Sequence, residues 1–486
     1  MGMIEKLSSL LKRGELSSKE LTKKYLDAIK GDNPILNAYV NVTEEEALSR
    51  AQKADEILHS AGDKASPLTG IPMGLKDNIC TRGIKTTCCS EMLRNHTPIY
   101  DATVWQRLKA QGAVLLGKTN MDEFAMGSSG DTSCFKGAKN PFDTARSTGG
   151  SSSGSAAAVA GNLAVYTLGS DTGGSVRQPA SFCGAVGLKP TYGAVSRNGL
   201  VAFASSLDQI GPMAMSVEDV SLVFDAIGGY DPMDSTSKKD YTPNTYKELK
   251  KDIKGKRLAV VCEFYDDVTQ EVAEAVKASL KIFENLGADI EIISVPSVHF
   301  SLPAYYILAC AEASSNLARY DGVRYGFRTK SEFDSINEMM TKSRSEAFGE
   351  EVKRRIMLGT YVLSHGYYDE YYKKAQMLRH SVIKGFGKVF EKFDAIVTPT
   401  SPTTAFKRGA LLTDPTQAYK ADICTVPANI AGLPAVSLPC GYDKKGLPIG
   451  LQIIGNKFCD AQVLSLAYNF QQTAEVAKTT DMGVSL

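Results

Sequence analysis

The chain has 486 residues, of which 43% are hydrophobic, and this length allows one large α/β domain or two or three smaller ones. Its 55 Lys and Arg residues against 54 Asp and Glu argue against this chain carrying a main nucleic-acid-binding surface, because such surfaces are basic. It contains no run of 18 apolar residues and no secretory h-region, so we expect a soluble, cytoplasmic protein. Ten cysteines without CxxC spacing predict reduced, mostly buried thiols.

The N-terminal part predicts helices, followed by strands and helices in alternation. Ser17 and Glu20 form a capping box before a segment whose apolar residues repeat at helical spacing. The elements expected after it are a helix over 43–61, a strand within 71–79, a helix over 101–111, a strand over 113–117, a helix over 155–160 and a strand over 164–168. This alternation predicts an α/β fold with a largely covered sheet.

The C-terminal half continues the same pattern. Residues 229–246 are polar and predict a long surface connection. Residues 257–295 predict a β-α-β unit, and residues 351–393 predict a long helical segment rich in Tyr, Lys and Arg. Two apolar runs within 435–455, separated by the turn DKKG, predict a closing hairpin.

The most unusual part of the chain is a Gly/Ser-rich segment at residues 147–199. It holds 11 glycines in 53 residues, serines stand beside them, and it contains no histidine. Glycine enrichment of this kind indicates backbone that approaches a ligand closely with its amide groups exposed. A serine beside such donors suggests a nucleophile next to an oxyanion hole, with an unusual base.

Two short motif matches are weak. Residues 112–119, GAVLLGKT, match the P-loop pattern, but a helix precedes the first glycine and the interval itself reads as the strand. Residues 150–154, GSSSG, match the nucleophile elbow, but a loop precedes them. An elbow also needs a downstream histidine, and His299, His365 and His380 all lack a convincing context.

Several long motifs together resemble the amidase signature family. They are GLKDNI (74–79), STGGSSSGSAAAVA (147–160), LGSDTGGSVRQPA (168–180) and SLDQIGPMA (206–214). Residues 353–376 and 422–441 further resemble the A subunits of glutamyl-tRNA(Gln)/aspartyl-tRNA(Asn) amidotransferases. Coincident motifs in one order are far more specific than any lone motif. The resemblance implies the amidase signature fold, a large mixed β-sheet covered by helices on both faces.

The resemblance also implies how the chain is organised. We expect a single domain over 1–486, with N-terminal helices over 1–62. The signature core with the catalytic triad is expected over 63–215. The remainder of the sheet and the substrate-recognition elements are expected over 216–486.

The family uses a Ser-cis-Ser-Lys triad, which carries over residue by residue. Ser175 takes the nucleophile position, Ser151 the bridging position after a cis peptide, and Lys76 the base position. A serine attacks only when a base removes its proton, and a neutral lysine can do this. Since a free lysine has a pKa of about 10.4, burial must lower the pKa of Lys76 by roughly three units. Without the resemblance, we would interpret Lys76 as a solvated strand end and the two serines as turn residues.

The loop that holds the nucleophile also predicts the oxyanion hole. Its expected donors are the successive amides of Thr172, Gly173, Gly174 and Ser175. Asp171 and Arg177 flank this loop, and we interpret them as a structural ion pair.

Recognition of free glutamine requires a buried acid for its ammonium and an arginine for its carboxylate. By the resemblance, Arg355 binds the carboxylate and Asp422 the ammonium. Tyr306 is a further expected contact, with the adjoining Tyr305 left open. The ordinary alternatives are a solvated helix face for Arg355 and a helix N-cap for Asp422.

The resemblance therefore implies a glutaminase that supplies ammonia within a heterotrimer, together with the B and C subunits of such an amidotransferase. The B subunit would use ATP and Mg²⁺ to activate misacylated Glu-tRNA(Gln) or Asp-tRNA(Asn), and tRNA would bind mainly there. We expect no cofactor, metal or membrane for this chain itself. A stand-alone amidase acting on other small or aryl amides, and an ATP-binding protein using residues 112–119, are the alternatives.

Overall fold

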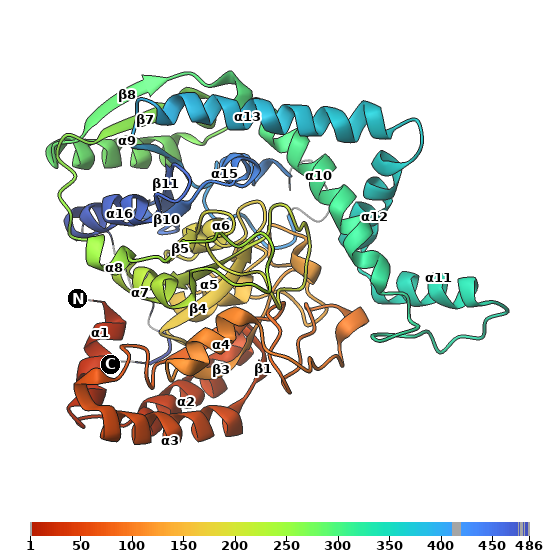
Figure 1. Cartoon of the computed structure of the whole chain (residues 1–486), viewed down its shortest axis with the longest axis horizontal. Helices are drawn as coiled ribbons and strands as arrows, with labels where there is room; N and C mark the ends of the chain where they lie inside the picture. Colours follow the sequence, from red (N-terminus) through yellow and green to blue (C-terminus); the bar gives the residue numbers. More distant parts are fainter. Residues whose placement is uncertain (1, 411–418, 475, 477–479, 481, 485–486) are drawn as a thin grey trace.

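A computed structural model describes residues 2–410, 419–474, 476, 480 and 482–484, and one mixed sheet runs through it (Figure 1). Within these residues the sheet has 11 strands. Their order across the sheet is β1 (Tyr39–Val42), β3 (Val114–Thr119), β2 (Pro72–Lys76), β4 (Tyr166–Asp171), β6 (Gln209–Ala214), β5 (Val186–Lys189), β10 (Ala435–Tyr442), β11 (Pro448–Gly455), β9 (Ala395–Pro399), β7 (Arg257–Val261) and β8 (Asp289–Ile293). The expected α/β fold with a mixed sheet is confirmed.

Helices surround this sheet along the whole chain (Figure 1). The longer ones are α1 (Met3–Lys12), α2 (Ser18–Leu36), α3 (Glu44–Ala61), α4 (Thr103–Ala110), α5 (Ser153–Ala160), α7 (Val217–Ile227), α9 (Gln270–Asn285), α10 (Ser301–Asn316), α11 (Ile336–Ala347), α12 (Glu350–Leu363), α13 (Lys374–Phe390) and α16 (Asp460–Ala474). Short helices are α6 (Arg177–Phe182), α8 (Thr245–Glu248) and α15 (Val426–Ala431). No helix in the described part of the chain combines the length and apolarity that crossing a membrane requires.

The two faces of the sheet pack into two separate cores. Along β9, Ala395 and Val397 join a core that includes residues of α9 and α16, whereas Ile396 joins another with residues of α10, α13 and α15. Ile453 and Ile454 of β11 divide in the same way. Successive side chains of a strand point to opposite faces, so this alternation shows that helices cover both sides of the sheet.

Most elements expected from the sequence are present. The Ser17 side chain accepts from the Glu20 amide and the Glu20 side chain accepts from the Ser17 amide, as in a capping box. The β-α-β unit is β7, α9 and the parallel strand β8, and the closing hairpin is β10 with β11. The polar connection expected over 229–246 contains no helix or strand up to residue 244, and α8 begins at Thr245, inside the expected range.

The long helical segment expected over 351–393 is interrupted, so that expectation is wrong in part. Helix α12 ends at Leu363, and α13 begins at Lys374 after a π-helical turn over Tyr368–Lys373. Between them Gly366 has a φ of 86°, a left-handed conformation that favours glycine and ends regular helix geometry. Figure 1 shows the resulting turn between α12 and α13.

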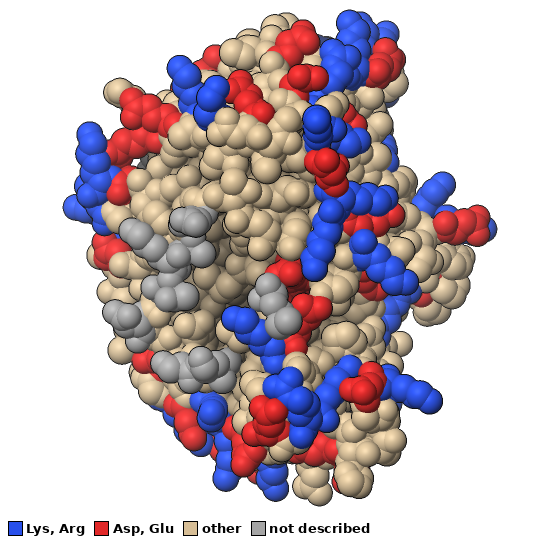
Figure 2. All heavy atoms as spheres, turned by 90° about the vertical axis from the view of Figure 1, so that its left-hand side faces the viewer, with Lys and Arg blue, Asp and Glu red and all other residues tan. Residues whose placement is uncertain are grey.

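The strands that carry the predicted active-site segments are neighbours. Strand β2 pairs in parallel with both β3 and β4, with Lys76 opposite Thr119 and Leu75 opposite Leu168. Because parallel strands end at the same edge of a sheet, the last residue of β2 and the loop after β4 lie together. In the view of Figure 2, acidic and basic side chains lie close to one another around the edge of the face, and its centre carries few of them.

Candidate active site

Lys76, the last residue of β2, is completely buried and points at a group of serine oxygens. Its Nζ donates to Ser151 Oγ at 2.8 Å, and to Oγ and the carbonyl oxygen of Ser170 at 2.9 and 3.1 Å. Burial lowers the pKa of Lys76 to about 7, although nearby carboxylates such as Asp122 favour the charged form. Lys76 is therefore not a solvated strand end, and a large fraction of it is neutral near pH 7.

The two serines assigned to the triad lie on adjacent loops. Ser151 follows a cis peptide bond from Gly150 and precedes α5, and Ser175 precedes α6. The Ser152 amide donates to the Ser175 carbonyl at 3.1 Å, which joins the two loops directly. Ser151 is fully buried, whereas Ser175 retains 7% exposure. Of the two serines, the one assigned to attack is thus the one that keeps some exposed surface.

The amides of the loop that carries Ser175 differ in whether they donate a hydrogen bond to another residue. The Gly174 amide donates to Asp171 Oδ1 at 2.9 Å, so its hydrogen points at that carboxylate. The amides of Thr172, Gly173 and Ser175 donate to no other residue in the described ranges. Three of the four expected oxyanion-hole donors therefore have no protein acceptor among the described residues.

Asp171 and Arg177 form a fully buried ion pair, which matches the structural interpretation. Arg177 Nη2 lies 3.0 Å from Asp171 Oδ1, and its Nε donates to Oδ2 at 3.0 Å. Burial alone would raise the pKa of Asp171, but the guanidinium holds it below its usual value. The same carboxylate fixes the Gly174 and Val176 amides, so the pair shapes the nucleophile loop.

Asp422 lies in a second buried polar cluster. Its Oδ2 accepts from Ser128 Oγ at 2.6 Å and from the Tyr306 hydroxyl at 3.2 Å. Burial raises the pKa of Asp422 to about 7, although the Ser128 hydrogen bond favours the ionised form. The carboxylate thus faces a pocket of side chains, and the N-cap of α15 is Thr425 instead.

Arg355 of α12 is only 3% exposed, so the solvated-face alternative does not hold. Its Nε donates to Glu351 Oε1 at 2.8 Å, and no other described residue accepts from its Nη groups. The guanidinium lies 5.3 Å from the ring centroid of Tyr306 and 5.8 Å from that of Tyr419. Stacking against aromatic rings fixes the guanidinium while leaving its outer edge to a ligand.

The second cluster borders the nucleophile loop. Thr425 Oγ1 donates to the Gly173 carbonyl at 2.7 Å and to the Asp422 carbonyl at 3.1 Å. A Cβ on Gly173 would lie 2.6 Å from the Tyr305 ring, which explains why glycine is needed there. Tyr305 therefore packs against the loop, while Tyr306 contacts Asp422. The triad and the Asp422 cluster are two sides of one site.

Three residues that contact the predicted site residues were not predicted from the sequence. Ser170 contacts Lys76, Ser128 contacts Asp422, and Glu351 contacts Arg355. Ser170 had a usable signal, since it stands at the carboxyl end of the strand parallel to β2. Ser128 had none, because it is 294 residues from its partner.

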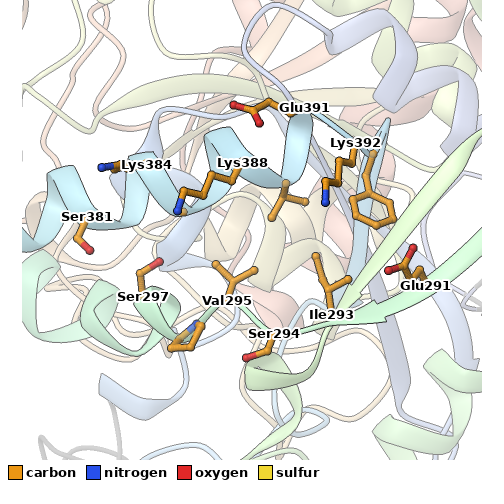
Figure 3. A pocket seen from close by; sticks show the side chains of 14 residues that line it. Glu291, Ile293, Ser294, Val295, Ser297, Ser381, Lys384, Lys388, Glu391 and Lys392 are labelled. Atoms are coloured by element: carbon orange, nitrogen blue, oxygen red, sulfur yellow. The ribbon is translucent and has the colours of Figure 1, made fainter.

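The structure also resolves the two weak motif matches. The interval of the P-loop match is strand β3, with Lys118 and Thr119 buried inside it. In the elbow match, Ser152 Oγ donates to the Ser170 carbonyl instead of meeting a histidine. A groove of about 770 Å³ between β8 and α13 is lined by Lys388, Lys392 and Ser297 and contains none of the predicted site residues (Figure 3).

Several known proteins are similar to this chain over nearly its whole length. It is 57% identical over 470 residues to the A subunit of glutamyl-tRNA(Gln) amidotransferase of Caldanaerobacter subterraneus subsp. tengcongensis, a match that covers 96% of each chain. The crystal structure of the corresponding A subunit from Thermotoga maritima is 42% identical with a TM-score of 0.80, and the match covers 96% of this chain and 94% of that one.

A more distant similarity extends beyond those subunits. The native peptide amidase from Stenotrophomonas maltophilia is 28% identical with a TM-score of 0.83, and the match covers 99% of this chain and 98% of that one. Residues 20–464 match the family described as Amidase. Since this match spans nearly the whole sheet and relatives share more than half of the sequence, the chain belongs to the amidase signature family.

Proposed function

We propose that this chain is the glutamine-hydrolysing A subunit of a tRNA-dependent amidotransferase. The observation that carries the chemistry is the contact of buried Lys76 with Ser151, whose loop is joined to that of Ser175 by the Ser152 amide. The observation that carries the substrate is the pairing of Asp422 and Arg355 around Tyr306. Relatives that bear this name, at 57% identity over 96% of the chain, support the same assignment.

The reaction runs as acyl transfer through an enzyme ester. Ser175 Oγ attacks the side-chain amide carbon of glutamine while its proton passes through Ser151 to neutral Lys76. The amides of Thr172, Gly173 and Ser175 stabilise the oxyanion. The proton returns to the leaving nitrogen, ammonia departs, and water then hydrolyses the γ-glutamyl ester to glutamate and free Ser175.

Substrate selection is assigned to the second cluster. The Nη groups of Arg355 suit the α-carboxylate, because a guanidinium binds a carboxylate through two parallel hydrogen bonds. Among the described residues, both donors to the Asp422 carboxylate use Oδ2, so Oδ1 is assigned to the α-ammonium. Simple amides lack both groups, so this cluster gives them no binding energy.

We further propose that the chain is a single domain that works in the cytoplasm within a heterotrimer. Its ten cysteines are all free, which favours a reducing compartment. The B and C subunits would complete the assembly, and the B subunit would hold ATP and Mg²⁺ and bind the misacylated tRNA. The assembly as a whole would then be a carbon–nitrogen ligase with glutamine as amido donor.

The test is ammonia release by the chain with and without co-expressed partners, on glutamine, asparagine and propionamide. The proposal expects glutamine to be preferred by orders of magnitude in kcat/KM. Comparable activity on all three, without any partner, would instead support a stand-alone amidase. ATP binding by the isolated chain would revive the P-loop interpretation of residues 112–119.

A further inference from the structure

Two adjacent acidic residues, Asp122 and Glu123, connect the triad to α12, the helix that carries Arg355, and the site described above assigns no role to Glu123. Asp122 serves the triad side. Its amide donates to the Ser151 carbonyl at 3.2 Å, and its Oδ2 accepts from the Gly130 amide at 2.9 Å. A Cβ on Gly150 would lie 2.0 Å from that same oxygen, so Asp122 lies tightly against the bridging-serine loop.

Glu123 contacts the start of α12, the helix that carries Arg355. It is 4% exposed, and its Oε2 accepts from the Gly349 amide at 2.8 Å, while its Oε1 accepts from the Ser90 hydroxyl. Gly349 is the N-cap of α12 and has no side chain to cap that helix itself. A Cβ there would lie 2.3 Å from Glu123 Oε2, so a glycine is required for this approach. Glu123 therefore binds the start of the helix that carries Arg355.

The backbone after Glu123 is held in an unusual conformation. Phe124 and Ala125 have φ values of 49° and 62°, a left-handed region that non-glycine residues rarely adopt. The Phe124 ring packs edge-on against Phe348, with centroids 5.7 Å apart, and Phe348 directly precedes Gly349. The same short turn thus contacts the two residues that precede α12, Gly349 by a carboxylate and Phe348 by an aromatic ring.

We propose that Glu123 is a positioning residue that sets Arg355 against the triad, and so determines selectivity for α-amino acid amides. Arg355 lies six residues after Gly349, within two helical turns, so a shift of the helix start moves the guanidinium. Burial raises the pKa of Glu123 to about 7, and above that pH the ionised carboxylate also interacts favourably with the N-terminal end of the helix. The selectivity part of this inference rests on the proposed glutaminase function.

The experiment uses the co-expressed complex and compares Glu123→Ala, Glu123→Gln and wild type. We expect Glu123→Ala to raise KM for glutamine about tenfold, because the buried acceptor of the Gly349 amide is lost, with propionamide kcat/KM within about twofold. Glu123→Gln keeps an acceptor oxygen and should recover most of the glutamine affinity. Hydrogen exchange of the amides from Gly349 to Arg355 should speed up in Glu123→Ala.

The matched control is Asp219→Ala. Asp219 of α7 is also buried, and its carboxylate accepts from the Met3 and Ile4 amides of α1 at 2.9 Å. It therefore joins two distant segments as Glu123 does, but neither segment belongs to the candidate active site. Equal loss on glutamine and propionamide in Glu123→Ala, or a matching selectivity change in Asp219→Ala, would overturn the proposal. If wild type hydrolyses no glutamine, the proposed function fails, and unchanged exchange along α12 in Glu123→Ala would separately contradict the positioning role.

Discussion

The Nζ of Lys76 lies 2.8 Å from the Oγ of Ser151, and neither side chain has exposed surface. In the proposed reaction this contact carries the proton that leaves Ser175. It can do so only when the lysine is neutral, which burial favours by lowering the pKa of Lys76 to about 7. In that reaction the pH dependence of the rate should therefore follow the protonation of Lys76.

The first prediction concerns pH. As pH rises through about 7, Lys76 loses its proton and becomes a base, so kcat/KM for propionamide should rise and then level off. Propionamide is the right substrate because it carries no ionised group of its own. Steady-state ammonia release between pH 5.5 and 9 measures the profile, and a flat profile would contradict the neutral base.

Substitution of the same lysine gives a second test of that mechanism. Lys76→Arg should lose activity by at least about 10³-fold, since an arginine stays protonated at any pH the protein survives. Lys76→Met should be equally inactive. Circular dichroism and thermal unfolding of each variant control for folding, and substantial activity in a folded Lys76→Arg protein would exclude the proton transfer.

The third prediction distinguishes the proposed nucleophile Ser175 from Ser152, the serine that directly follows Ser151. Ser175→Ala should lose about 10⁴-fold or more in kcat, as removal of a serine nucleophile does. Ser152→Ala keeps the backbone hydrogen bond to Ser175 and should lose far less. Acid quenching during turnover, followed by intact-protein mass spectrometry, should show a γ-glutamyl adduct in wild type and none in Ser175→Ala.

The triad residues were predicted from the resemblance to the amidase signature family, because long motifs carry them, and the regular segments on which they stand explain why they lie together. Lys76 ends an apolar strand and Ser175 follows another, and parallel neighbouring strands bring such ends together. Local patterns were equally informative for the capping box at Ser17 and for the hairpin of β10 and β11. In these elements a few neighbouring residues decide the structure.

The rest depends on contacts between distant segments, which one sequence does not record. Ser128 and Asp422 are 294 positions apart, and Glu123 reaches Gly349 across 226. The hydrogen bond from the Gly174 amide to Asp171 could not be predicted either, since it depends on the orientation of the Asp171 carboxylate. From their sequence pattern, residues 351–393 were predicted to form one long helical segment. The structure interrupts that segment around Gly366, because this glycine has a left-handed backbone conformation.

The second cluster leads to a prediction about substrate binding. Burial raises the pKa of Asp422 to about 7, so below that pH its carboxyl gains a proton and loses attraction for an ammonium. The ratio of kcat/KM for glutamine to that for propionamide should therefore fall as pH drops from 8 to 6. The ratio cancels the titration of Lys76, which affects both substrates.

Asp422→Asn is the matching variant. It should lower the glutamine-to-propionamide ratio at pH 8 by at least about tenfold and abolish its pH dependence, because the amide side chain carries no charge. Ammonia release on both substrates at each pH measures it. An unchanged ratio in Asp422→Asn would assign the ammonium to another group.

The last prediction concerns the ion pair under the nucleophile loop. Arg177→Met leaves the Asp171 carboxylate buried without its partner, and removing one member of a buried pair costs about 3–5 kcal/mol. Because Arg177 holds the pKa of Asp171 below its usual value, this stabilisation is present at neutral pH and is lost only in strong acid. The urea midpoint at pH 7 should fall clearly for Arg177→Met. The double variant Arg177→Met/Asp171→Asn should recover part of that loss, since it removes the unpaired charge, whereas a midpoint as low as that of the single variant would mean that packing of the guanidinium, and not charge, supports the loop.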